Sequence, residues 1–497
     1  MTIDTSIIRI GDLNDELATY FKDKIDFTKY ELGILRNSIK HYLDKLRDDL
    51  WLYIEYPYTD RVFRDSYYHY FSSKSTEYHR HCIRIALFGD EISELDFRTA
   101  STNKVQDIYL GFFVIRPLLA PIGRNVISPK ALKVVNFSCC TTKFSTLING
   151  KKLEVLGFPH LSQDSETHSC AESTIWATME YFSHRYPEYR PVLPSEIIGT
   201  LKKISYERQI PSNGLSLEHI SFALKEYGFG TKIYTRNEYS ESDLRMILST
   251  YIESGIPVTI GIQSKTIGHA IIAIGRENIN SAMINGISQT PLSDSLNIFD
   301  FSTTNKQLVF FDDNFGPYQK AHPKKPTEHY QSDEWKECRI FCFVAPLHPK
   351  IYLEAYAVKK AIYSILKNYS SKLEISDGNL IRYFLTSSRS YKNSVSSNST
   401  YSDNLKEIIL SIALPKFIWI CELSTKDSYI NDKCHGLILI DATEPNAIDT
   451  KPIIFFLYND KFINFAPKFS ESEDIILYYL SKVECFSPYK NNLNTYN

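Results

Sequence analysis

Helical patterns precede apolar strands in the middle of this 497-residue chain, and this order limits the fold more than any other feature. From Cys170 onwards apolar side chains recur at helical spacing, and two further helical patterns cover residues 217–227 and 242–253. The apolar segments typical of strands come later, at residues 257–262, 269–274, 307–311 and 339–344. Helices followed by a sheet in one stretch predict an α+β fold, with a helical lobe packed on an antiparallel sheet.

The chain is too long for a single hydrophobic core, so we expect three units, each of the α+β class. The first covers residues 1–145, the central one 146–348 and the last 349–497. In the first unit the predicted elements are a helix over 28–50, where Thr28 and Glu31 have capping-box spacing, and strands over 51–58, 82–88 and 109–115. In the last unit they are a helix over 351–369, a loop over 396–402, strands over 417–423 and 436–440, and a hairpin over 453–465.

The charge balance and the cysteines limit the class of protein. The net charge is -2, which gives no reason to expect a nucleic acid or a membrane surface as partner. The first residues lack the pattern of a signal peptide and no apolar run is long enough to span a bilayer, so we expect a cytoplasmic protein. The nine cysteines include no CxxC pair and suggest no disulfide framework, which fits that location.

Cys170 differs from the other cysteines because it stands at the start of a predicted helix. Unpaired N–H groups and the positive end of the helix dipole favour the thiolate form of a cysteine in that position. Gln163 lies seven residues upstream, in the loop before the helix. Its side-chain amide, together with the backbone N–H of Cys170, is a candidate donor to a developing oxyanion.

His269 and Asp312 supply the groups that a nucleophilic thiol requires. His269 follows Gly268 at the first position of an apolar strand, where an imidazole is a poor choice for core packing and a suitable one for a base. The next apolar strand ends in Asp312 and Asp313, and a carboxylate there would orient the imidazole. We consider His168 a weaker candidate for the base, because a base normally approaches the thiol from another element.

These motifs, in this order, resemble those of the papain-like cysteine peptidases, and most closely the bacterial branch related to peptidases that cut leader peptides after double glycine. The resemblance covers roughly residues 150–348, and the flanking regions match no family. Its motifs here are Gln163, Cys170, the segment Gly255-Ile256-Pro257-Val258, Gly268-His269 and Asp312. The sequence departs from the family in a polar insertion around residues 277–306 and in a second acid after the first, so Asp313 stays an alternative to Asp312.

The resemblance implies a papain-like central domain that cleaves a protein or peptide through a Cys-His-Asp triad and a thioester intermediate. The catalytic residues would be Cys170, His269, Asp312 and Gln163, with no cofactor and no metal. Two other functions use or retain the same residues: a thiol acyltransferase or deamidase, and a catalytically silent binding scaffold. We expect the flanking units to control access to the site, and a regulatory protein to bind through them.

Overall fold

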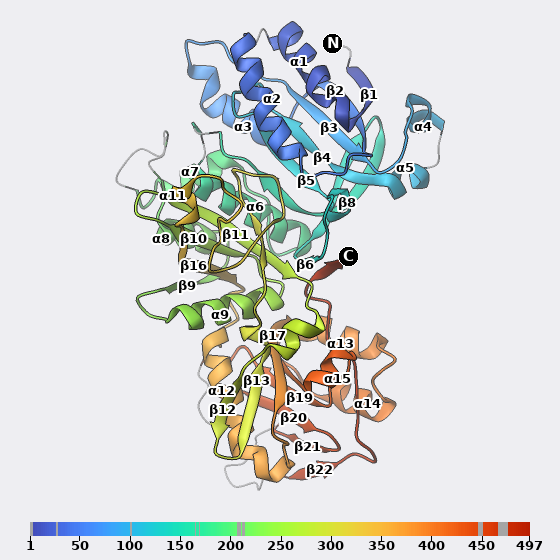
Figure 1. The fold of residues 1–497 in the computed structure, drawn as a ribbon, viewed down its shortest axis with the longest axis vertical. Coiled ribbons are helices and arrows are strands. Elements are labelled where there is room, and N and C mark those ends of the chain that lie inside the picture. Colours follow the sequence, from blue (N-terminus) through green and yellow to red (C-terminus); the bar gives the residue numbers. More distant parts are fainter. Residues whose placement is uncertain are drawn as a thin grey trace.

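The computed structural model describes residues 3–25, 28–99, 102–164, 166, 167, 169–205, 210, 214–445, 451–465 and 476–497. These residues form three sheets that follow one another along the long axis of the molecule (Figure 1). Helices cover the sheets, and nearly all neighbouring strands are antiparallel, so the predicted α+β class is confirmed. None of the helices in these ranges combines the length and the apolar character needed to cross a membrane.

The first sheet lies between two helical layers. Its strands, in order, are β1 (Asp4–Arg9), β2 (Trp51–Tyr58), β3 (Cys82–Phe88), β4 (Tyr109–Ile115), β5 (Ile122–Ile127), β8 (Lys151–Leu161) and β7 (Thr142–Ile148). Helices α1 (Leu13–Ile25) and α2 (Lys29–Leu43) pack on one face, and α3 (Arg61–His69), α4 (Glu94–Thr99) and α5 (Thr102–Ile108) pack on the other. Every residue of β3 is buried, because successive side chains enter opposite cores.

The sequence predicted β2, β3 and β4 with their observed bounds, and the capping box of Thr28 and Glu31 is present at the start of α2. The predicted end of that helix at residue 50 is wrong, because α2 ends at Leu43. Leu46 and Leu50 are nevertheless buried in the same core. Their apolar spacing therefore reflects burial beyond the helix rather than continued helix.

The second sheet holds the central segment. Its strands, in order, are β15 (Gln319–Ala321), β14 (Leu308–Phe311), β11 (Gly268–Glu277), β10 (Val258–Gln263), β16 (Arg339–Leu347) and β9 (Gly230–Thr235), and β6 (Phe137–Cys139) pairs with both β11 and β23 (Asn494–Tyr496). The helices that pack here are α6 (Cys170–Arg185), α7 (Pro194–Leu201), α8 (Leu217–Glu226) and α9 (Glu241–Glu253). The last two end before Gly228 and Gly255, whose φ angles of 99° and 70° terminate helices as predicted.

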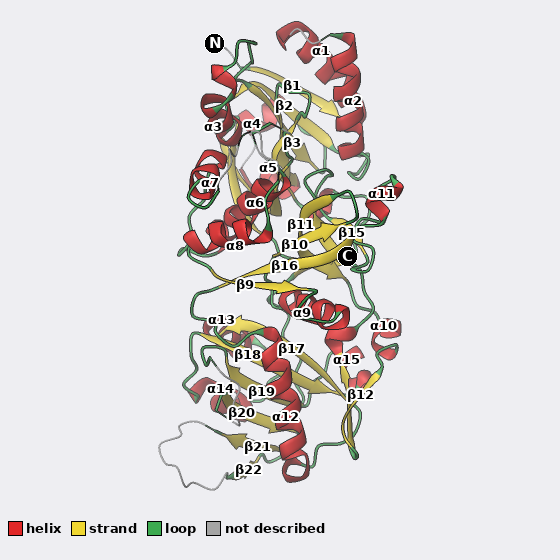
Figure 2. Ribbon diagram, turned by 90° about the vertical axis from the view of Figure 1, so that its left-hand side faces the viewer, coloured by secondary structure: helices red, strands yellow, loops and turns green. Residues whose placement is uncertain are grey.

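The third sheet completes the molecule. Its strands, in order, are β12 (Gln289–Ser293), β13 (Leu296–Asp300), β17 (Asn379–Ser387), β18 (Phe417–Ser424), β19 (Gly436–Asp441), β20 (Ile453–Tyr458), β21 (Lys461–Asn464) and β22 (Leu477–Tyr479). Helix α12 (Ala355–Leu373) packs on one face, while α13 (Ser388–Ser397) and α14 (Asp403–Ser411) pack on the other. The short helices α10 (Ser281–Asn285) and α15 (Lys426–Ile430) contact each other beside this sheet (Figure 2).

The three sheets do not coincide with the three units predicted over 1–145, 146–348 and 349–497. Strand β8, in the range expected to be central, belongs to the first sheet, and β12 and β13, from the polar insertion, join the third. The loop predicted over 396–402 begins only after residue 397, because α13 continues to Ser397. Hydrophobic periodicity identifies a strand but contains no information on its partner, which explains why the bounds of the units differ.

A buried ionic cluster joins the second sheet to the third. Glu253, the last residue of α9, pairs with Arg276 on β11 at 2.5 Å and with Arg382 on β17 at 3.2 Å. Arg382 also pairs with Glu422 on β18 at 2.8 Å. Burial alone would raise the pKa of Glu253, but the charges of Arg276 and Arg382 outweigh it and lower the pKa to about 2. Glu253 therefore stays charged, and its ion pairs with Arg276 and Arg382 fix the two sheets relative to each other.

We expect Glu253→Ala to lower the free energy of unfolding by about 3–5 kcal/mol, because it leaves the buried Arg382 and the partly buried Arg276 without their shared partner. Glu241→Ala is the matched control, since Glu241 pairs with Arg245 at the surface of the same helix, and it should cost about 1 kcal/mol or less. Urea unfolding of both variants measures the difference. Equal losses would contradict the role of the cluster.

Candidate active site

Cys170 is the first residue of α6, as predicted. Glu172 accepts a hydrogen bond from the backbone N–H of Ser169 at 3.0 Å and another from its hydroxyl, which fixes the start of the helix. Among the nine cysteines, Cys170 is partly exposed, Cys485 is exposed and the other seven are buried. Cys170 is thus the one cysteine that combines partial exposure with a helix N-terminus.

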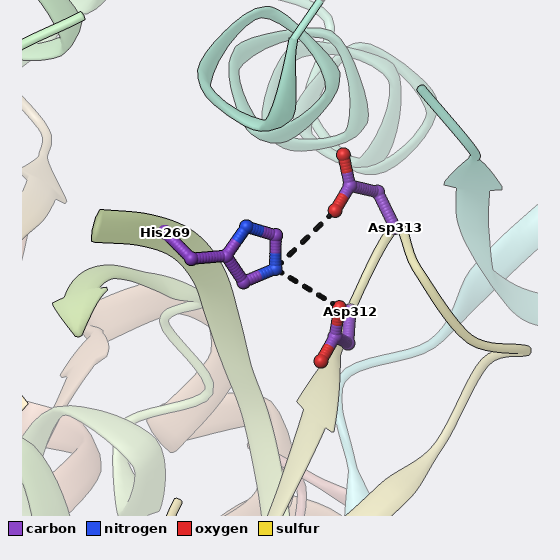
Figure 3. Close-up of side chains that lie close together, drawn as sticks. All are labelled: His269, Asp312 and Asp313. Carbon is purple, nitrogen blue, oxygen red and sulfur yellow. Dashed lines mark hydrogen bonds and ion pairs between the residues drawn. The ribbon is translucent and has the colours of Figure 1, made fainter. Parts of the chain in front are cut away.

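His269 enters the site from the start of β11 and is buried. Its Nε2 lies 3.0 Å from Asp312 Oδ1 and 3.4 Å from Asp313 Oδ1, so both acids at the end of β14 approach the same ring nitrogen (Figure 3). The side chain of Cys170 interacts with the same imidazole and contributes to raising its pKa. Since Nε2 faces the carboxylates, Nδ1 is the ring nitrogen left for the thiol. The structure therefore brings the predicted thiol, base and acid together.

The charges around His269 favour its protonated form. Burial alone would lower the pKa of the imidazole, but the charge of Asp312, the hydrogen bonds to Asp312 and Cys170, and the charge of Asp313 outweigh burial. Together they raise the pKa of His269 well above its ordinary value. An imidazolium next to a thiol stabilises the thiolate, which is the nucleophilic form of cysteine.

Asp312 is buried and surrounded by hydrogen-bond donors. Tyr330 OH lies 2.9 Å from Oδ2 and 3.1 Å from Oδ1, His329 Nε2 lies 3.1 Å from Oδ2, and the backbone N–H of Asn314 donates to Oδ1 at 3.1 Å. Burial would raise the pKa of Asp312, but the charge and hydrogen bond of His269 and those of His329 hold it far below the ordinary value. This carboxylate stays ionised in the site.

Asp313 has the opposite environment. It is buried, and neither carboxylate oxygen has a hydrogen-bond partner among the described residues. Burial raises the pKa of Asp313 to about 7, with the charges of Asp312 and Glu172 adding to the effect and that of His269 opposing it. Of the two acids, Asp312 therefore has the hydrogen-bond donors and the shorter distance to His269 Nε2.

Gln163 lies beside the segment that follows Asp312 and Asp313. Its Nε2 donates a hydrogen bond to Asn314 Oδ1, and its backbone carbonyl accepts one from Arg116 Nη2 at 3.1 Å. Asn314 in turn donates to Tyr330 OH at 3.1 Å. Two hydrogen bonds, through Asn314, therefore connect Gln163 to Tyr330, whose hydroxyl donates to Asp312.

Aromatic side chains cover the imidazole. Trp335, in α11 (Asp333–Lys336), lies edge-on to His269 with ring centroids 5.2 Å apart. Tyr330 stacks on Trp335 at 4.1 Å with an interplanar angle of 10°. This segment thus shields the contact between His269 and Asp312 from water, which strengthens the electrostatic interaction there.

The first sheet supports the acid from behind. His160 on β8 is fully buried, donates from Nε2 to the backbone carbonyl of Asp312 at 3.0 Å and accepts at Nδ1 from Asn125 at 2.9 Å. Burial lowers the pKa of His160 to about 4, so the imidazole is neutral. Tyr318 also links the segment after Asp312 to this sheet, because its hydroxyl donates to the carbonyl of Ile127 at 2.8 Å. Asn125 and Ile127, from the range predicted as the first unit, therefore help to support the acid, beyond any control of access.

His160, His329, Tyr330 and Trp335 were not among the residues singled out from the sequence. His160 lies in the first sheet, His329 and Tyr330 lie in the segment between β15 and α11, and Trp335 lies in the one-turn helix α11. No local pattern marks them. Of the alternatives, His168 falls outside the described residues. In the part of the chain that the structure describes, the one group of His, Cys or acidic side chains positioned to hold a metal ion is His269, Asp312 and Asp313.

No protein-family model matches this chain, and a search of the curated proteins finds no match. The function proposed below therefore rests on the residues and their geometry.

We expect His160→Phe to lower the free energy of unfolding by about 1–3 kcal/mol, because the ring is kept while the Asp312 carbonyl and the Asn125 amide lose their partner. The neutral form of His160 stabilises the fold fully above a pH of about 6.5, the value of an unfolded histidine, and less as the pH falls towards 4. The cost of the variant should therefore shrink over that range.

Thermal unfolding at several pH values measures this difference. His69→Phe, at an exposed position in α3, is the control and should change stability by about 0.5 kcal/mol or less at any pH. A His160→Phe variant as stable as the parent at neutral pH would contradict the anchoring role.

Proposed function

We propose that the chain is a cysteine peptidase of the papain-like type, with Cys170 as nucleophile, His269 as base and Asp312 as the acid that orients the base. The observation that carries the proposal is the position of the His269 ring, whose Nε2 lies 3.0 Å from Asp312 Oδ1 while the side chain of Cys170 helps to raise the pKa of the imidazole. This is the arrangement that nucleophilic catalysis by a thiol needs. The placement of the thiol at a helix start, against an antiparallel sheet that supplies the base and the acid, supports it further.

The proposed reaction is acyl transfer. The Cys170 thiolate attacks the carbonyl carbon of a peptide bond, a C–S bond forms, and the oxygen becomes negatively charged. The backbone N–H of Cys170 and the side-chain amide of Gln163 donate to that oxygen. The C–N bond breaks as the His269 imidazolium gives its proton to the leaving amine. Water, deprotonated by His269, then hydrolyses the thioester and restores the thiol.

The reactivity of Cys170 provides a test that needs no substrate. At a pH of about 6, ordinary thiols are almost entirely protonated, so we expect iodoacetamide to alkylate Cys170 at least tenfold faster than the exposed Cys485. Peptide mass spectrometry measures both rates in the same sample, so Cys485 is an internal control. Faster labelling of Cys485 would contradict an activated thiol.

The two acids provide a second test. We expect Asp312→Asn to slow the alkylation of Cys170 and any peptidase activity, the latter by about 10²–10⁴-fold, because the imidazolium loses its carboxylate partner. Asp313→Asn removes a carboxyl group with no hydrogen-bond donor, and we expect an effect of less than tenfold. The reverse order would show that the orienting acid is Asp313.

The class of reaction is tested in cells that express the parent chain or Cys170→Ala. New protein termini that appear only with the parent chain are the expected result for a peptidase. Ammonia release or substrate acylation without new termini would contradict the peptidase and support the deamidase or acyltransferase instead.

A further inference from the structure

Three atoms of the site are spaced as the ligands of a divalent metal ion. His269 Nε2 lies 3.0 Å from Asp312 Oδ1 and 3.4 Å from Asp313 Oδ1, and the three ligand atoms all lie within 4.8 Å of one another. Zinc bonds of about 2.0–2.2 Å at tetrahedral angles separate neighbouring ligand atoms by roughly 3.3–3.6 Å. The distance of 3.4 Å from the imidazole to Asp313 falls in that range, and the distance of 3.0 Å to Asp312 lies just below it.

Asp313 is the second observation that points to a cation. Its side chain is 99% or more buried, neither oxygen accepts a hydrogen bond from a described residue, and one oxygen is directed at His269 Nε2, 3.4 Å away (Figure 3). A buried carboxylate without a hydrogen-bond donor is costly, and a second carboxylate lies next to it. A divalent cation between Asp312 and Asp313 would neutralise both charges at once and give Asp313 a closer charged partner than the imidazole.

The groups around these three atoms are of the kind that hold the ligands of a metal ion in place. Ligating carboxylates are normally held by further hydrogen bonds, and Asp312 Oδ2 accepts from His329 and Tyr330. Imidazole with carboxylates is a ligand set for Zn²⁺, whereas Ca²⁺ and Mg²⁺ prefer oxygen alone. Helix α11, whose Trp335 covers His269, is exposed at its other three residues.

We propose that His269 Nε2, Asp312 Oδ1 and Asp313 Oδ1 bind one Zn²⁺ ion, with water as the fourth ligand, and that the ion reversibly inhibits the site. Binding takes the lone pair of Nε2, so any proton on that nitrogen leaves to solvent. The remaining imidazole proton is then on Nδ1, facing Cys170, and the ring cannot accept the proton of the thiol. The binding rests on the geometry alone, while its effect on Cys170 rests on the proposed function.

Direct binding to the full chain, stripped with a chelator and then desalted, tests the site. Competition with a chromophoric zinc indicator should show one Zn²⁺ per chain, and Asp313→Asn should weaken it by at least tenfold. All variants carry Cys485→Ala, which removes the exposed thiol as a competing ligand. No stoichiometric binding, or an unchanged affinity in Asp313→Asn, would overturn the proposal.

The Cys170→Ala variant separates this site from capture of zinc by the thiol, and it does so without any activity. We expect its affinity for Zn²⁺ to stay within threefold of the parent. Co²⁺ in the parent should give the visible absorption of a tetrahedral site without a thiolate charge-transfer band. Loss of binding in Cys170→Ala, or a strong thiolate band, would place the metal on Cys170 and refute the proposed ligands.

The effect on the thiol is measured separately in the parent chain. Saturating Zn²⁺ should slow the alkylation of Cys170 by at least tenfold, and a chelator should restore the rate. An unchanged rate with zinc bound would overturn the inhibitory role. If the thiol is unreactive even without zinc, the proposed peptidase fails, whereas the binding experiments still decide the metal site.

Discussion

A carboxylate that is fully buried has to be surrounded by donors, and the site depends on how Asp312 meets this requirement. His269 comes from β11, His329 and Tyr330 come from the loop after β15, and Asn314 donates from its own backbone. Behind the carboxylate, His160 from the first sheet holds the backbone carbonyl. The acid is therefore positioned by two sheets and a loop, and a change in any of them is transmitted to the imidazole.

The neighbouring acid shows how strongly environment determines the chemistry of identical side chains. Asp312 and Asp313 are adjacent in sequence, both are buried, and both approach the same nitrogen. Burial raises the pKa of Asp313, whereas on Asp312 the charges and hydrogen bonds of His269 and His329 outweigh burial and lower the pKa. The sequence could not distinguish these residues, because the difference arises from partners 17 and 18 residues further along the chain.

Local patterns were sufficient for much of the fold and for the core of the site. The start of α6 at Cys170 and the strand that begins with Gly268 and His269 follow from apolar spacing and chemical type. The residues that support the site do not follow from such patterns. The partner of His160 lies 152 positions away in sequence, and β13 pairs in parallel with a strand about 80 residues later, so neither contact leaves a periodic signal.

The pairing of β6 with β23 has a consequence for how the chain matures. Ser138 and Thr495 hydrogen-bond across these strands although 357 residues separate them. Closing so long a loop is entropically costly, so contacts of this kind form late in folding. Between the two strands lie the segment that carries Cys170, His269 and Asp312 and the third sheet, and both are synthesised before β23. The pairing of β6 is therefore completed only after the chain has been synthesised as far as Tyr496.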